Sequence, residues 1–129
     1  MLRLEFETKS VRRIYTKVQL ANPFKDITGE ATSAWDTGAT HTVVSEDVVE
    51  ILELEKIGEM PASSATTDVT AGIYICKITL EDLTELTLPV ISAPNLSTDI
   101  LIGMDLISMG ELHIGHNEDG NLFFSFEIP

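Results

Sequence analysis

Turn-forming residues interrupt this chain about every ten residues, and this spacing constrains its fold more than any other feature. Clusters rich in Asn, Asp, Pro, Gly, Ser or Thr occupy residues 22–26, 81–85, 93–99 and 117–121. The segments between them are mostly too short for long helices. In "RRIYTKVQL", Ile14, Val18 and Leu20 fall on one face of an extended chain, and "TGEATSAW" (28–35) follows as a second strand. The pattern predicts many short strands.

One segment changes to a helical period. In "SEDVVEILEL" (45–54), Ser45 is suited to the N-cap, and two acidic residues follow in the first turn. An apolar stripe is expected from Val48, Val49, Ile51 and Leu52. A second short helix is expected after Gly103, ending at Gly110. Because no linker or repeat interrupts the pattern, residues 1–129 are expected to form one all-β domain with one or two short helices.

Residues 61–80 are expected to form two strands joined by a tip of small residues near Thr66–Gly72. Cys76 shares a face of the second strand with three large apolar residues, namely Tyr74, Ile78 and Leu80. We therefore interpret it as a packed core thiol and not as a nucleophile. As the only cysteine, it excludes an intrachain disulfide and is typical of a reducing compartment, so we expect a cytoplasmic protein.

Charge and composition argue against several classes of function. The formal net charge of −13 disfavours nucleic acid and anionic membranes as partners and weakly favours neutral or basic substrates. The charged N-terminus predicts no signal peptide, and no apolar run is long enough to span a membrane. A spacing of three along a strand would place His113 and His116 on opposite faces, so we expect neither a metal site nor a cofactor.

The stretch "TSAWDTGATHTVV" (32–44) places a carboxylate, Asp36, at the end of an apolar strand and before very small residues. A surface turn and a catalytic carboxylate on a tight loop both explain this arrangement. Gly38 would let the backbone turn and bring an N–H group near the carboxylate. Two other acidic residues, Asp99 and Asp105, are interpreted as loop and helix-start residues, not as a second catalytic carboxylate.

The segments "AWDTGATHTVVSEDVVEIL" and "DILIGMDLISMG" resemble the retropepsin-like (retroviral-type) aspartic proteases. The resemblance covers most of residues 12–115, and the tail "GHNEDGNLFFSFEIP" is more similar to an uncharacterised bacterial branch than to the viral enzymes. It implies a closed, mostly antiparallel acid protease barrel. It also implies a homodimeric aspartic endopeptidase that acts on peptides or proteins.

The resemblance assigns a role to each residue of the motif. One Asp36 from each of two chains would form a dyad, in which one carboxylate activates water and the other, protonated, acts as an acid. The counterpart of Thr37 bonds across the dyad to the partner chain, and Ala39 leaves room for the substrate backbone. A supporting role beneath this loop falls to Leu101, Ile102 and Gly103.

Several positions depart from the viral pattern. The viral enzymes commonly carry an acidic residue where this chain has Thr40, and an arginine where it has Met104. His41 could contact substrate or face solvent, and a flap could be formed by Ser63–Gly72. The substrate-binding candidates are Thr40, His41, Ser64, Ala65 and Thr66. The alternative function is a catalytically weak or inactive peptide-binding or scaffold module on the same fold.

Overall fold

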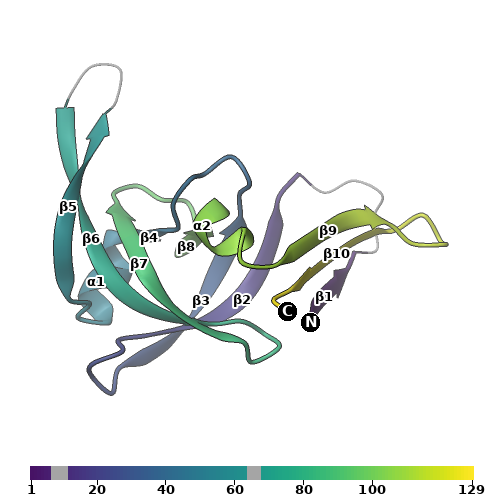
Figure 1. Cartoon of the computed structure of the whole chain (residues 1–129), viewed down its shortest axis with the longest axis horizontal. Coiled ribbons are helices and arrows are strands. Elements are labelled where there is room, and N and C mark those ends of the chain that lie inside the picture. Colours follow the sequence, from purple (N-terminus) through teal and green to yellow (C-terminus); the bar gives the residue numbers. More distant parts are fainter. Residues whose placement is uncertain (7–11, 64–67) are drawn as a thin grey trace.

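Two β-sheets make up most of the chain, as seen in a computed structural model that describes residues 1–6, 12–63 and 68–129 (Figure 1). The elements within these ranges are β1 (Leu2–Glu5), β2 (Ile14–Ala21), β3 (Thr28–Trp35), β4 (Val43–Ser45), α1 (Glu46–Ile51), β5 (Lys56–Ser63), β6 (Asp68–Thr79), β7 (Glu85–Ala93), β8 (Ile100–Ile102), α2 (Met104–Ile107), β9 (Glu111–His116) and β10 (Leu122–Glu127). No helix in these ranges is long and apolar enough to cross a membrane.

The larger sheet forms a closed barrel. Its strand order is β2-β3-β8-β4-β7-β6-β5, and an additional pairing of β2 with β6 closes the ring and leaves β5 outside as an edge strand. The pairs β3–β8 and β4–β7 are parallel, whereas the other pairs are antiparallel. The predicted closed, mostly antiparallel barrel is therefore confirmed, although the sheet is mixed.

The smaller sheet has the order β1-β10-β9 and lies beside the barrel (Figure 1). Leu2 pairs with Phe126, so the two chain termini lie next to each other. The prediction contained no strand at Leu2–Glu5, although Leu2 and Leu4 alternate with charged residues there. Four residues are too few for that alternation to be distinctive, and the strand depends on its pairing with β10.

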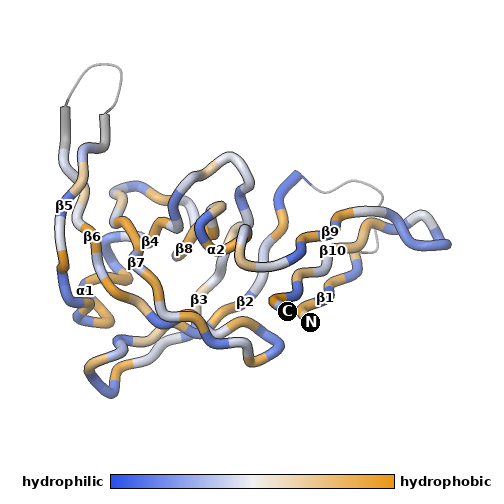
Figure 2. The backbone as a smooth tube through the Cα atoms, viewed as in Figure 1, coloured by the Kyte–Doolittle hydropathy of each residue, from blue (hydrophilic) through white to orange (hydrophobic). Residues whose placement is uncertain are grey.

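Alternating burial along the strands fills the barrel. In β2, the side chains of Ile14, Thr16, Val18 and Leu20 are buried, and those between them are exposed. The turn between β9 and β10 is strongly hydrophilic, and apolar residues recur along the strands (Figure 2). Cys76 is fully buried, as predicted, and burial raises the pKa of its thiol to about 11.

Both helices lie where the sequence predicts them, but they are shorter. The hydroxyl of Ser45 accepts a hydrogen bond from the Val48 N–H at 3.2 Å, which confirms the predicted N-cap of α1. The helix ends at Ile51, and Glu53 adopts a left-handed conformation with φ of 51°. Ile51 is 71% exposed, so its assignment to the buried stripe was wrong, because that face of the helix points away from the barrel.

The β5–β6 hairpin differs from its prediction. β5 begins at Lys56, and it tolerates Pro61 because it is an edge strand. Gly72 pairs with Glu59 within the hairpin arm, and the last described pair is Ser63 with Asp68. The tip therefore comes before Gly72, at residues that lie outside the described ranges.

Candidate active site

Trp35, the last residue of β3, is held by ring packing and by a hydrogen bond. The Trp35 ring packs against Phe124 and Phe126, with ring centroids 5.0 Å apart in both pairs. Its Nε1–H donates to Thr16 Oγ1 at 3.0 Å, within a buried network that includes Ser33. These contacts join the barrel to the smaller sheet at the residue before Asp36. The backbone that carries the Asp36 carboxylate is therefore fixed by packing on both sheets.

The short strand β8 holds the start of the Asp36 loop. Its residues pair in parallel with the end of β3, where Trp35 lies opposite Ile102. The Asp36 N–H extends this ladder by donating to Ile102 O at 2.9 Å. Leu101 and Asp36 line the same pocket. The structure thus brings the apolar-apolar-Gly element directly against the aspartate.

A tight turn folds back onto the carboxylate. The Gly38 N–H donates to Asp36 Oδ1 at 2.8 Å, and the Ala39 N–H donates to Asp36 O at 3.2 Å. A Cβ added at Gly38 would lie 3.1 Å from Asp36 Oδ1, so any larger residue would crowd the carboxylate. Asp36 is half-buried, while Thr37 and Gly38 are exposed. The carboxylate is therefore both held in place and open to a ligand.

The start of α2 binds the far side of the loop. The Met104 N–H donates to Ala39 O at 2.7 Å, and the Asp105 N–H donates to Thr40 O at 3.2 Å. A Cβ added at Gly103 would lie 2.5 Å from His41 O, a contact too short for any side chain. Gly103 is therefore required by the close approach of two backbones.

A buried threonine completes this link. Thr42 is fully buried, and its hydroxyl donates to Asp105 Oδ1 at 2.6 Å while accepting from the Gly103 N–H at 3.2 Å. The Thr42 N–H donates to Asp105 Oδ2 at 3.0 Å. These bonds join the loop to α2, although Thr40 and Met104 replace the acidic residue and the arginine that are common in the viral enzymes. Sequence reasoning placed Asp105 at the helix start but did not detect its bonds to Thr42, which is distant in sequence.

A pocket of about 360 Å³ opens beside Asp36. Thr37, Arg12 and Arg13 also line it. Its apolar wall combines residues of the barrel with residues of the smaller sheet, among them Trp35, Leu101, Leu112, Ile114, Leu122 and Phe124. The pocket provides an apolar surface next to a carboxylate, which suits a peptide side chain.

The family follows from comparison with known sequences. Residues 27–109 match the model of the family described as "gag-polyprotein putative aspartyl protease", and this match includes Asp36 and the Gly103 segment. The chain belongs to this family. A comparison with curated proteins gives no match.

Solved structures of aspartyl proteases and related domains share the fold. The retroviral protease-like domain of Ddi1 from Leishmania major has a TM-score of 0.55 at 11% identity, covering 92% of this chain and 96% of that chain. A retropepsin-like aspartic protease from Rickettsia conorii has a TM-score of 0.54 at 12% identity, covering 87% of this chain and 92% of that chain. At these identities the likeness shows a retropepsin-like fold alone.

The residues predicted to bind substrate fall into two groups. Thr40 and His41 lie on the Asp36 loop, and both are exposed in the single chain. The flap candidates Ser64, Ala65 and Thr66 lie outside the described residues. The geometry adds Arg12 and Arg13, which sequence reasoning missed. A basic doublet in an acidic chain was the available signal.

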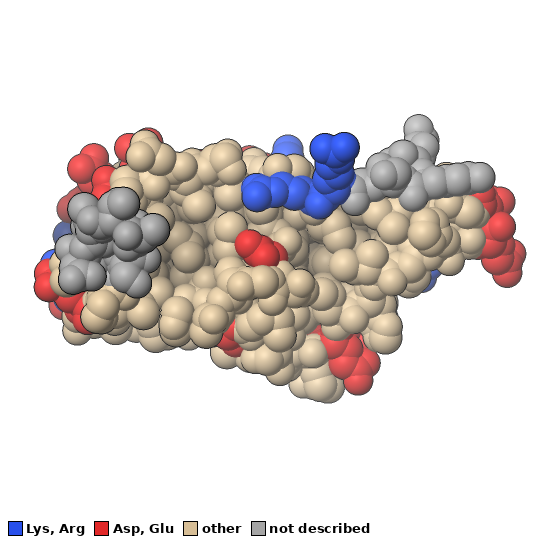
Figure 3. Space-filling model, turned by 90° about the horizontal axis from the view of Figure 1, so that it is seen from above, with Lys and Arg blue, Asp and Glu red and all other residues tan. Residues whose placement is uncertain are grey.

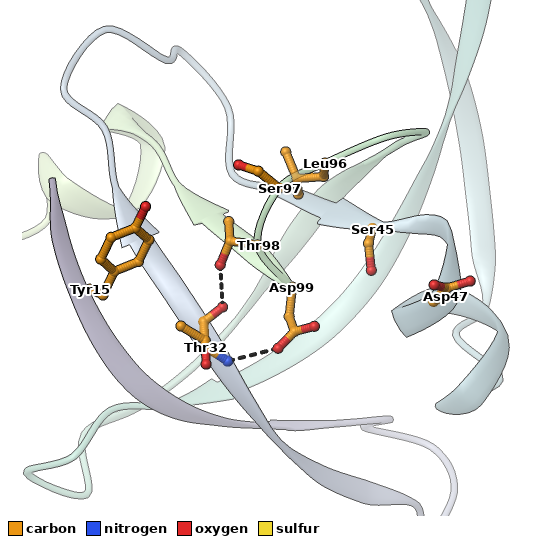
Figure 4. A pocket seen from close by; sticks show the side chains of 8 residues that line it. All are labelled: Tyr15, Thr32, Ser45, Asp47, Leu96, Ser97, Thr98 and Asp99. Carbon is orange, nitrogen blue, oxygen red and sulfur yellow. Dashed lines mark hydrogen bonds between the residues drawn. The ribbon is translucent and has the colours of Figure 1, made fainter.

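A second pocket, of about 380 Å³, is lined by Asp99 but not by Asp36 (Figure 4). There, Asp99 Oδ2 accepts from the Thr32 N–H at 2.9 Å, and the Thr98 hydroxyl donates to Thr32 O at 2.7 Å. Asp99 thus ties the loop before β8 to β3. Within residues 1–6, 12–63 and 68–129, no group of three or more His, Cys, Asp or Glu side chains could hold a metal ion.

Proposed function

We propose that the protein is an aspartic endopeptidase that acts as a homodimer, with one Asp36 from each chain in the active site. The observation that carries this proposal is the Asp36 carboxylate itself. Its Oδ1 accepts a hydrogen bond from the Gly38 N–H at 2.8 Å, and the carboxylate lines a pocket with an apolar wall. Membership of an aspartyl protease family supports the same reading. Because one chain supplies a single Asp-Thr-Gly loop, a second copy has to supply the other carboxyl.

The proposed chemistry needs only these two carboxyls and water. Two carboxyls in contact cannot both ionise, so they share one proton and titrate as a pair. The ionised Asp36 takes a proton from water as the water oxygen attacks the peptide carbonyl carbon. The protonated copy gives its proton to the carbonyl oxygen. The Asp36 carboxyl that took the proton from water then gives it to the amide nitrogen, while its copy takes a proton from a hydroxyl group of the tetrahedral intermediate. The C–N bond breaks, the acid and amine products leave, and the two carboxyls again share one proton. No covalent enzyme intermediate forms.

An open sheet edge supports the proposed dimer. Among the described strands, β9 pairs only with β10, so it is an edge strand of the smaller sheet, to which a strand of another chain could add. Ile114 on β9 is 54% exposed, and it lines the Asp36 pocket together with Leu112. A second copy added at this edge would bury exposed apolar surface close to the aspartate.

The decisive experiment compares wild type with Asp36→Asn on a peptide library at pH 4–7, with products identified by mass spectrometry. We expect cleavage by wild type, none by Asp36→Asn, and an optimum below pH 7. Asp26→Asn makes the same chemical change at an exposed residue outside the loop and should retain cleavage. Identical products from wild type and Asp36→Asn, or no products from either, would overturn the proposal and favour a peptide-binding module.

A further inference from the structure

Five of the seven Lys and Arg side chains that the structure describes contact an aromatic ring or a carboxylate. Arg3 lies 4.9 Å from the centroid of the Phe123 ring. Every described lysine lies within 4.0 Å of a glutamate carboxylate, in the pairs Lys17–Glu30, Lys25–Glu53, Lys56–Glu59 and Lys77–Glu85. Among the residues that the structure describes, Arg12 and Arg13 are the cations without such a partner. Two unpaired guanidinium groups are notable in a chain with 21 acidic residues.

Both arginines lie next to the candidate active site. They directly precede β2, whose first residue, Ile14, pairs with Trp35 at the end of β3. They are exposed, and both line the pocket that contains Asp36. Seen from above, a group of basic side chains lies near the middle of the face, where most of the surface is uncharged, and an isolated acidic group lies nearby (Figure 3). The two charges are thus available to a molecule bound beside Asp36.

Electrostatics indicates which ligand these arginines suit. An acidic side chain that approaches the pocket meets repulsion from Asp36 and from a net charge of −13. The positive charges of two consecutive residues that line the pocket oppose that repulsion locally, and each guanidinium group can bind a carboxylate through two hydrogen bonds. Residues 37–42 of a partner's loop contain no acidic residue, so that loop offers these arginines no carboxylate apart from Asp36 itself.

We propose that Arg12 and Arg13 form a subsite for an Asp or Glu side chain of the peptide substrate, close to the bond that is cut. This inference rests on the proposed function and specifies its substrate class. It replaces the expectation of neutral or basic substrates, because the local charge beside Asp36 is opposite to the net charge of the chain.

The test uses pairs of peptides that differ only by Glu or Gln at one position near the cleaved bond. We expect wild type to prefer the Glu peptide by about 3- to 10-fold in kcat/KM, a modest value because both arginines are exposed. The preference should weaken in high salt. In Arg12→Gln/Arg13→Gln, the ratio should fall to near one. The control Lys17→Gln/Lys25→Gln removes the same charge elsewhere and should keep the wild-type ratio.

Binding measured without cleavage separates this inference from the proposed function. Calorimetry on Asp36→Asn should show the same Glu preference, and that result would support the subsite even if wild type cuts no peptide. Cleavage by wild type with equal rates for Glu and Gln peptides at every position would overturn the subsite alone. If Arg12→Gln/Arg13→Gln weakens dimerisation in sedimentation and lowers activity equally on both peptides, the arginines bind the partner chain, and the subsite is also overturned.

Discussion

The buried Thr42 hydroxyl bonds both Asp105 and Gly103, so its removal tests whether β8 and α2 hold the Asp36 loop. Thr42→Val keeps the shape of the side chain but removes its bond to the Asp105 carboxylate and leaves the Gly103 N–H without its acceptor. A hydrogen bond to a charged group contributes about 1.5–3 kcal/mol, and a buried donor left unpaired costs about 1–3 kcal/mol. Burial of the added methyl group stabilises the folded state by about 0.8 kcal/mol. The net loss of unfolding free energy is therefore about 2–5 kcal/mol.

The single tryptophan makes this measurable, because Trp35 lies against Phe124 and Phe126 next to the loop. Urea unfolding is followed by its fluorescence at one fixed protein concentration, since a dimer is more stable at higher concentration. The slope of free energy against urea should not change. Thr42→Ser, which keeps the hydroxyl, should lose no more than about 1 kcal/mol. If the unfolding free energy of Thr42→Val lies within about 1 kcal/mol of the wild-type value, the view that this hydroxyl holds the loop is refuted.

Two further predictions concern close packing and burial. Gly103→Ala should lower the unfolding free energy by about 1–3 kcal/mol and reduce any cleavage, because its Cβ meets the His41 backbone. In Gly29→Ala the nearest atom is a side-chain carbon at 3.8 Å, so unfolding curves like those of Gly103→Ala would contradict this reasoning. Cys76, with a thiol pKa of about 11, should not react with a disulfide reagent at pH 8 until urea unfolds the chain. Because the unfolded thiol ionises near its ordinary pKa of 9.0, stability should fall as pH rises from 9 to 11; a flat profile would count against this burial.

Local sequence rules predicted those features that depend on neighbouring residues. Alternation placed β2, and the Ser45 cap with its acidic first turn placed α1. The same rules failed where packing decided. Ile51 was expected in the apolar stripe of the helix yet faces solvent, and β5 begins at Lys56 instead of at the predicted Pro61, because an edge strand tolerates a proline. Gly72 was expected at a hairpin tip, but strand register places it opposite Glu59.

By itself, the sequence determined the β-rich fold class and placed Asp36 in its loop, and its single Asp-Thr-Gly is the reason for proposing a second chain. Only the tertiary structure showed that Thr42 bonds Asp105 and that Arg12 and Arg13 line the Asp36 pocket. The physical reason is the range of the interactions. Turns, caps and alternation act between residues a few positions apart, whereas the pocket is assembled by strand pairings that bring distant segments together. Which charges meet there depends on those pairings, and net charge indicated the opposite.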